Sequence, residues 1–409
     1  MYERLLEYRK VIGQQTLETI FRIAERLSEK KVKMVNSTAV GGGVAEILHR
    51  LVPLMNELGV ETSWEVIKGG EEFFNITKAI HNSLHGKAEP LTAEMQKVFL
   101  EVNRDNAKNM SFDQDCVFIH DPQPIPLVEE RGKHQAKWIW RCHIDVSSPF
   151  ESVWDFIKTY VEKYDASIFS APSFARELKI PQYQISPSID PLSLKNREVH
   201  PREIEDLLQR YKIDPERPII TQISRFDRLK DPSGVIETYK LVKRSTDCQL
   251  VLAGGTATDD PESVEVLPHV LSHAGKDPDI HVIELPPNSD LQINVLQRAS
   301  TIILQKSLKE GFALTVTEAL WKKKPVVASA VGGIPLQVIH NYTGLLVHSI
   351  EGAAFKVRYL LNNPALAKKL GENGYQHVRN NFLITRHLRD YLLLLIALDH
   401  PGENVINLG

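Results

Sequence analysis

The sequence predicts an α/β protein of two doubly wound domains, each a parallel sheet covered by helices, facing each other across a cleft. The chain has 409 residues, which is long for a single hydrophobic core. Short apolar runs alternate with helical patterns through both halves, as in parallel sheets with crossover helices. A polar, proline-bearing stretch at 187–218 divides the halves and is the best candidate for a linker.

In the first half, an amphipathic helix at 14–29 leads into a strand at 31–36, a glycine loop and a helix at 44–58. Four further strands are expected at 116–119, 138–142, 166–170 and 183–185. We assign residues 1–200 to the first domain, and we expect a C-terminal helix within 383–409 to pack back on it.

After a helix at 201–211, the second half repeats this alternation and forms the second domain, residues 214–382. Its strands are expected at 218–223, 249–255, 280–283, 301–304, 326–328 and 344–347. Ligands of such sheets bind beyond the carboxyl ends of the strands, so the loops at those ends are the places to search for chemistry.

The composition is that of an ordinary soluble protein, with 42% hydrophobic and 25% charged residues. A formal net charge of −3 argues against nucleic acid as the main partner. Three widely separated cysteines indicate neither a disulfide framework nor a zinc ribbon. The charged N-terminus lacks a signal-peptide pattern, and the longest apolar run, 391–398, is too short to span a bilayer. We therefore expect a cytoplasmic protein that does not bind a membrane.

The most informative stretch runs from Glu310 to Glu318, between the strand at 301–304 and a predicted helix. A strand, a tight glycine turn at Gly311 and a helix start leave backbone N–H groups free to bind an anion. Glu318, expected in the first turn of the helix, could bind paired ribose hydroxyls. Glu310 could bind hydroxyls of a second, neutral part of the same ligand. Glutamate is also favoured in a first turn for dipole reasons alone. The pattern indicates a sugar nucleotide.

A basic pair, Arg225 and Lys230, follows the first strand of the second half. A guanidinium binds phosphate as a planar fork and an ammonium adds a mobile charge, so both could reach one anion. The alternative is a solvated basic loop. This basic pair and the Glu310–Glu318 loop both follow carboxyl ends of strands in one sheet, and that coincidence favours a phosphate site.

Glycine loops and polar strand ends complete the set. The triplet Gly41, Gly42 and Gly43 lets backbone approach a ligand, although it also fits a tight strand-to-helix connection. Gly332-Gly333-Ile334 has the same two readings. His120-Asp121 and Arg141-Cys142-His143 end two strands of the first half, as an acceptor pocket would require, although a lone histidine there is more often structural. The loop at 258–260 reads as solvated, and no metal cluster is evident.

These residues resemble the retaining glycosyltransferases of the GT-B fold, family 4, over nearly the whole chain. The marks are the two glutamates eight apart, the Arg225/Lys230 pair and the Gly-Gly-Ile loop at 332–334. In the first half, the segments at 35–46, 120–124 and 138–145 look like the archaeal glycosyltransferring trehalose synthases, and the trehalose phosphorylases share much of this pattern. The resemblance implies two Rossmann-like domains.

The resemblance also implies an activity, in which glucose passes reversibly between a nucleoside diphosphate (UDP or ADP) and free glucose to give α,α-trehalose. It assigns Arg225 and Lys230 to the diphosphate and Glu318 to the ribose. Glu310 and His143 would hold the transferred sugar. It further places Asp121 in the acceptor region and the N–H groups of Leu314 and Thr315 at the leaving phosphate. Because Gly42 and Gly43 precede a helix, they could face that phosphate from the other domain. No tightly bound cofactor or metal is implied beyond the UDP-glucose or ADP-glucose donor, and a homodimer is left open.

Two positions depart from the family pattern: Asp231 stands where glycine is usual, beside the expected phosphate site, and Leu336-Gln337 replaces a frequent glutamate. Four alternatives stay open: a phosphorylase that uses glucose 1-phosphate, a family 4 transferase with another acceptor, a sugar-nucleotide epimerase, and a binding module in which Asp231 has spoiled phosphate binding. With no obvious carboxylate nucleophile, we expect retention by same-face attack rather than double displacement.

Overall fold

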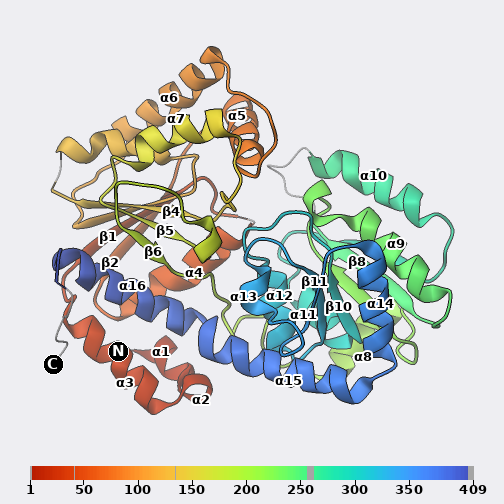
Figure 1. Ribbon diagram of the computed structural model, residues 1–409. Coiled ribbons are helices and arrows are strands. Elements are labelled where there is room, and N and C mark those ends of the chain that lie inside the picture. The colour runs from red at the N-terminus through yellow and green to blue at the C-terminus, as the bar shows by residue number, and fades with distance from the viewer. Residues whose placement is uncertain (1, 41, 134, 256–261, 404–409) are drawn as a thin grey trace. The chain divides into compact units, whose positions relative to one another are not determined.

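The computed structural model describes residues 2–40, 42–133, 135–255 and 262–403, and they form two compact units. Unit 1 comprises residues 1–188 and 384–409, and unit 2 comprises residues 189–383. Each unit contains one six-stranded parallel sheet flanked by helices (Figure 1). The doubly wound α/β class predicted from the sequence is confirmed.

Unit 1 has the strand order β2-β1-β3-β4-β5-β6. Its strands are β1 (Lys31–Asn36), β2 (Glu61–Val66), β3 (Cys116–His120), β4 (Lys137–Cys142), β5 (Ala166–Phe169) and β6 (Gln182–Gln184). Its helices are α1 (Glu3–Glu7), α2 (Arg9–Ile12), α3 (Gln14–Glu25), α4 (Gly42–Glu57), α5 (Glu71–Leu84), α6 (Ala93–Lys108), α7 (Glu151–Val161) and α16 (Ile384–Asp399), with 3-10 turns η1 (Ile125–Lys133) and η2 (Pro172–Phe174). Figure 1 shows α5, α6 and α7 on one side of this sheet and α3, α4 and α16 on the other.

The central strands of unit 1 are buried on both faces, which is why they read as continuous apolar runs. All residues of β3 are buried, and β4 is buried from Trp138 to Cys142. The edge strand β2 is mostly half-exposed, and its polar sequence, Glu-Thr-Ser-Trp-Glu-Val, gave no strand prediction.

Unit 2 has the strand order β12-β11-β10-β7-β8-β9. Its strands are β7 (Ile219–Ile223), β8 (Gln249–Gly254), β9 (Ile280–Glu284), β10 (Ile302–Gln305), β11 (Val326–Ser329) and β12 (Leu345–Val347). Its helices are α8 (Pro201–Arg210), α9 (Pro232–Lys243), α10 (Glu262–Ala274), α11 (Asp290–Ala299), α12 (Leu314–Trp321), α13 (Ile334–Gln337), α14 (Ile350–Leu361) and α15 (Pro364–Asn381), with the 3-10 turn η3 (Arg228–Lys230).

Alternate residues of β8 supply the two cores of unit 2. Leu250 and Leu252 pack in a cluster with residues of α9, α14 and α15, whereas Val251 and Ala253 pack with residues of α8 and α11. Successive side chains of a strand point to opposite faces, so a strand covered on both sides needs apolar residues at every position.

The chain passes from unit 1 to unit 2 at Ser188–Ile189, earlier than the predicted boundary between residues 200 and 214. The segment from 189 to 200 is tied to unit 2 by hydrogen bonds. The side-chain amide of Asn294 donates to the carbonyls of Leu194 and Arg197, and Ile189 forms a parallel bridge with Leu383. The returning helix α16 contacts α3 and α4 of unit 1.

Both sheets have a point where the direction of winding reverses. In unit 2 the strand order runs outward from β7 on one side and from β10 on the other, and in unit 1 the corresponding neighbours are β1 and β3. The carboxyl ends of strands at such a switch point are the usual ligand sites of doubly wound sheets. Most of the residues singled out from the sequence follow these four strands.

Candidate functional site

The loops after β7 and β10 bring Lys230 and Glu310 together at the switch point of unit 2. Lys230 Nζ lies 2.6 Å from Glu310 Oε1. The same carboxylate oxygen lies 3.0 Å from Ser307 Oγ and 3.5 Å from Gln305 Nε2. Glu310 is 5% exposed, while the side chain of Lys230 is 19% exposed. A buried carboxylate is thus held by a cation that solvent can still reach.

Gln222, near the end of β7, holds both loops in place. Its Nε2 donates to the carbonyl of Lys230 at 2.9 Å, and its Oε1 accepts from the backbone N–H of Lys306 at 2.9 Å. A second tie joins the backbone N–H of Leu308 to the carbonyl of Leu229 at 2.7 Å. The amide therefore fixes the spacing of the two strand ends from within the sheet.

Gly254, at the end of β8, lets the loop after β7 pass close by. A Cβ on this residue would lie 1.7 Å from the carbonyl oxygen of Ser224, so only glycine fits. The close approach sets the path of Ser224 and Arg225.

Arg225 lies nearer the surface than Lys230. Its side chain is 44% exposed, and its Nη2 lies 3.8 Å from Asp227 Oδ2. The carboxylate of Asp227 also accepts from the backbone N–H of Leu229 at 2.7 Å. The convergence of Arg225 and Lys230 on one anion stays a prediction.

The unusual Asp231 contacts Gly234 and Lys306. It adopts a left-handed conformation with φ 49°, as glycine would, and its Oδ1 accepts from the backbone N–H of Gly234 at 3.0 Å to cap α9. Its Oδ2 lies 3.1 Å from Nζ of Lys306, whose side chain is 8% exposed. The charge that the sequence placed beside the phosphate site is therefore paired with a buried lysine.

The turn between Glu310 and α12 depends on tight backbone contacts. A Cβ on Gly332 would lie 1.7 Å from the carbonyl oxygen of Glu310, and the N–H of Gly333 donates to the carbonyl of Gly311 at 3.1 Å. Ala313 precedes α12 in the left-handed region with φ 68°. The side-chain amide of Gln337 donates to the carbonyl of Phe312. The Gly-Gly-Ile loop and Gln337 thus brace this turn, while Leu314 and Thr315 begin the helix.

The prediction that Glu318 lies in the first turn of the helix is wrong. Because the turn reaches Ala313, α12 begins at Leu314, and Glu318 is its fifth residue. The side chain is 1% exposed, and its Oε1 lies 3.7 Å from Nζ of Lys195. The same lysine lies 3.7 Å from Asp290. Sequence reasoning missed Lys195, which stands alone in the linker and gives no spacing signal.

In unit 1, His120 is the last residue of β3, Asp121 follows it, and His143 follows β4. Nδ1 of His120 lies 3.1 Å from Nε2 of His143, and the rings stack at 5.4 Å. Oδ1 of Asp121 accepts from the backbone N–H of His143 at 2.7 Å. Asp121 has φ 65°, and its carbonyl accepts from the indole of Trp140 at 3.0 Å. The structure thus gathers these three predicted residues at one edge of the sheet.

Burial decides the protonation of this cluster. It lowers the pKa of His120 to about 3, with a further lowering from the Arg141 guanidinium. Burial raises the pKa of Asp121 to about 7, opposed by the His143 N–H and by Arg141. Burial and then Arg141 also hold the pKa of His143 well below its usual value. Neutral imidazoles next to a carboxyl of raised pKa suit hydrogen bonding to a neutral sugar.

Gly42 opens α4 with φ 77°, and a Cβ there would meet nothing within 4 Å. Together with Gly43 it starts the helix after β1, at the switch point of unit 1. Two other predicted features, Gly41 and the loop at 258–260, lie outside the described residues. A ligand-facing role for Gly42 and Gly43 stays a prediction.

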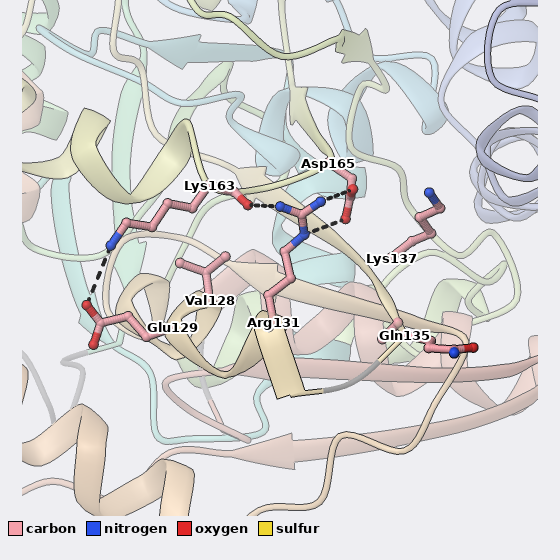
Figure 2. Close-up of a pocket in the computed structure, with 9 residues that line it drawn as sticks. Val128, Glu129, Arg131, Gln135, Lys137, Lys163 and Asp165 are labelled. Atoms are coloured by element: carbon pink, nitrogen blue, oxygen red, sulfur yellow. Dashed lines mark hydrogen bonds and ion pairs between the residues drawn. The ribbon is translucent and has the colours of Figure 1, made fainter.

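The opposite end of this sheet has a pocket of about 680 Å³, lined by residues of η1, β4 and their neighbours (Figure 2). Arg131 crosses it and donates to both carboxylate oxygens of Asp165, at 2.5 and 3.1 Å. Lys163 lies 3.6 Å from Glu129. Four of its charged groups thus form two ion pairs. The pocket lies at the amino ends of β4 and β5, away from His120 and His143.

Two further properties concern the described residues alone. Within 2–40, 42–133, 135–255 and 262–403, no helix is long and apolar enough to cross a membrane. Over the same ranges, no three histidine, cysteine or carboxylate side chains are grouped as a metal site would require.

Both halves of the chain match models of known protein families. Residues 34–176 match the family model of the trehalose synthase N-terminal domain, and residues 203–377 match the glycosyl transferases group 1. The trehalose synthase of Thermococcus litoralis is 48% identical over 400 residues, covering 96% of this chain and 97% of that protein. A trehalose phosphorylase of Pleurotus pulmonarius is 30% identical and covers 99% of this chain but 62% of that protein.

Solved structures show the same architecture. The sucrose-phosphate synthase of Thermosynechococcus elongatus superposes with a TM-score of 0.70 at 19% identity, covering 91% of this chain and 99% of that chain. At that identity the likeness concerns the fold alone, and it is the GT-B fold expected from the sequence.

Proposed function

Because the chain belongs to the trehalose synthase family of GT-B glycosyltransferases, we propose that it transfers glucose reversibly between a nucleoside diphosphate and free glucose, forming α,α-trehalose with retention. Full-length identity of 48% to a curated trehalose synthase supports this assignment. The observation that carries it is the Lys230–Glu310 pair at the switch point of unit 2. The cation can bind the diphosphate of the donor, and the carboxylate can bind the hydroxyls of its neutral glucosyl unit.

Unit 2 supplies the groups for the donor. Lys230 and Arg225 bind the diphosphate, with the first N–H groups of α12 at the leaving oxygen. Glu318 binds the ribose, and Glu310 binds hydroxyls of the glucosyl unit. Lys230 Nζ lies 2.6 Å from Glu310 and offsets its charge. Binding of the diphosphate then gives this ammonium a second anionic partner.

Unit 1 supplies His143 and Asp121 for the sugars. In the transition state an oxocarbenium-like sugar forms while negative charge grows on the departing phosphate. Fixed cations and amides stabilise that charge more than the ground state. The acceptor hydroxyl attacks from the face that the phosphate leaves, and the phosphate takes its proton. The cytoplasmic location and a homodimer also stay predictions.

The experiment is to incubate the protein with trehalose and UDP, ADP or inorganic phosphate in separate reactions. We expect glucose and a nucleotide sugar from one of the diphosphates, which also identifies the donor base. Release of glucose 1-phosphate with inorganic phosphate alone would instead support a phosphorylase, which the 30% identical fungal relative keeps in view.

The remaining alternatives give different products. Conversion of the nucleotide sugar without an acceptor would indicate an epimerase, and transfer to a sugar other than glucose a different family 4 transferase. Tight nucleotide-sugar binding with no turnover would indicate a binding module. The Asp231–Lys306 pair at 3.1 Å removes the main reason for that last alternative, a bare carboxylate beside the phosphate.

A further inference from the structure

The hydrogen bond between His120 and His143 joins two neutral rings. Nδ1 of His120 and Nε2 of His143 are 3.1 Å apart, and the ring planes are 15° from parallel. A neutral imidazole carries one proton, on one of its two nitrogens. The bond therefore runs in one of two directions, and its direction fixes which nitrogen of His143 bears a hydrogen.

Arg141 decides between the two directions. It pairs with His120 across β3 and β4, and its side chain is fully buried. Arg141 Nε and Nη1, and His120 Nε2, are buried without a hydrogen-bond partner among the described residues. A proton on His120 Nε2 would bury an N–H without an acceptor, next to a cation. A proton on Nδ1 is instead donated to Nε2 of His143, and Nε2 of His120 keeps a lone pair, which costs less near the Arg141 charge than an N–H would.

We propose that Arg141 and His120 set the tautomer of His143, so that Nδ1 of His143 carries its proton and presents a hydrogen-bond donor to the transferred sugar. This rests on the proposed function for the sugar contact, but the tautomer itself does not. Nε2 of His143 is taken by His120, which leaves Nδ1 as the ring nitrogen that can reach a ligand.

The backbone of His143 is fixed as firmly as its ring. Oδ1 of Asp121 accepts from the N–H of His143 at 2.7 Å, and His143 is partly exposed whereas His120 is 1% exposed. His120 is thus a positioning residue that acts through His143, and the site selects an oxygen acceptor such as a sugar hydroxyl at that point.

The test is nitrogen NMR of the full chain labelled with ¹⁵N-histidine. The chain has 15 histidines, so His143→Gln assigns the ring by the signals that vanish. From about pH 6 to about pH 8, we expect His143 to keep a protonated Nδ1 and an unprotonated Nε2. In His120→Leu this pattern should be lost, and kcat/KM for trehalose should fall about tenfold. His120→Asn, whose amide can occupy the place of Nδ1, should retain both.

A wild-type spectrum with the proton on Nε2 of His143 would overturn the proposal. So would His120→Leu with unchanged His143 signals and unchanged kcat/KM. Should the leucine variant not fold, the wild-type spectrum and the asparagine variant decide the matter. A wild-type protein that makes no trehalose would refute the proposed function and leave the spectrum as a test of the tautomer.

Discussion

The two switch points handle buried polar groups in opposite ways. In unit 2, charges are kept and paired: Lys230 with Glu310 at 2.6 Å, and Lys306 with Asp231 at 3.1 Å. In unit 1, burial and neighbouring guanidinium groups lower the pKa values of His120, His143 and His387, which favours neutral rings. Paired charges can exchange partners with a charged ligand, whereas neutral rings can only exchange hydrogen bonds. The difference matches a donor with a diphosphate and an acceptor that is a free sugar.

The contrast between the two units would be wrong if the paired charges of unit 2 were dispensable for activity. Lys230→Ala should lower kcat/KM at least about a hundredfold, because removing one preorganised donor at a developing charge typically costs about 3–4 kcal/mol. Arg228→Ala is the matched control, since Arg228 is in the same loop but pairs with Glu265 at the surface. Steady-state kinetics with trehalose and the active nucleotide measure both. Equal activities would remove Lys230 from the reaction.

The second test concerns the nucleotide. Glu318→Gln should weaken nucleoside diphosphate binding about tenfold, because a carboxylate binds paired hydroxyls more strongly than an amide. Titration calorimetry measures the dissociation constant, and Glu372→Gln on α15 is an exposed control. An affinity equal to that of the wild type would contradict the ribose role and leave Glu318 with a structural role, such as its contact with Lys195.

The third test concerns pH and unit 1. The pKa values of His120, His143 and His387 are lowered, so the unfolded chain gains protons before the folded one as pH falls below about 6.5. The pKa of Asp121 is raised to about 7, so this group binds its proton first in the folded chain and adds stability as pH falls from about 7 to about 4. Because the three histidines outweigh the one carboxyl, we expect the free energy of unfolding to fall by about 1–3 kcal/mol for each unit that pH is lowered from about 6.5 to about 5.

Tryptophan fluorescence during urea unfolding can follow this, because Trp64, Trp138, Trp140 and Trp154 all lie in unit 1. In His387→Asn the slope with pH should be shallower, since one lowered group is removed while an amide can still meet Ser188. A stability that is flat over this range would mean that the histidines accept protons in the folded state.

The smallest effect is expected for the Asp231–Lys306 pair. A double-mutant cycle with Asp231→Gly and Lys306→Met should give a coupling of about 1 kcal/mol in unfolding free energy, since the pair is largely buried. Asp231→Gly alone relieves the left-handed backbone but loses a helix cap, two effects of similar size. If the effects of the two single substitutions on unfolding free energy add up to that of the double variant, the two charges do not interact.

Local sequence carried most of the fold. Runs such as 249–254 and 302–305 are buried on both faces, so their apolar content identified them as strands. The polar edge strand β2 lacked that signal. Loop chemistry after strands could also be anticipated, because parallel strands bring their carboxyl ends to one edge.

What escaped prediction was pairing over long separations. Lys306 and Asp231 are 75 residues apart, and Lys195 meets Glu318 from the linker. Arg141 sits in an apolar strand, where a charge reads as exposed, yet its side chain is fully buried. Such contacts depend on how crossovers place distant loops, which no short window of sequence records. The position of Glu318 was missed because a left-handed alanine delays the helix.

The return of the chain through α16 has a consequence for synthesis. The guanidinium of Arg386 donates to the carbonyls of Ser186 and Pro187 at 2.6 and 3.1 Å, and Leu388, Leu392 and Leu395 are fully buried. A ribosome makes these residues only after all of unit 2. While the inserted domain is translated, the face of the first sheet that carries α3 and α4 therefore still lacks its third helix. That interval is where a chaperone would be needed most.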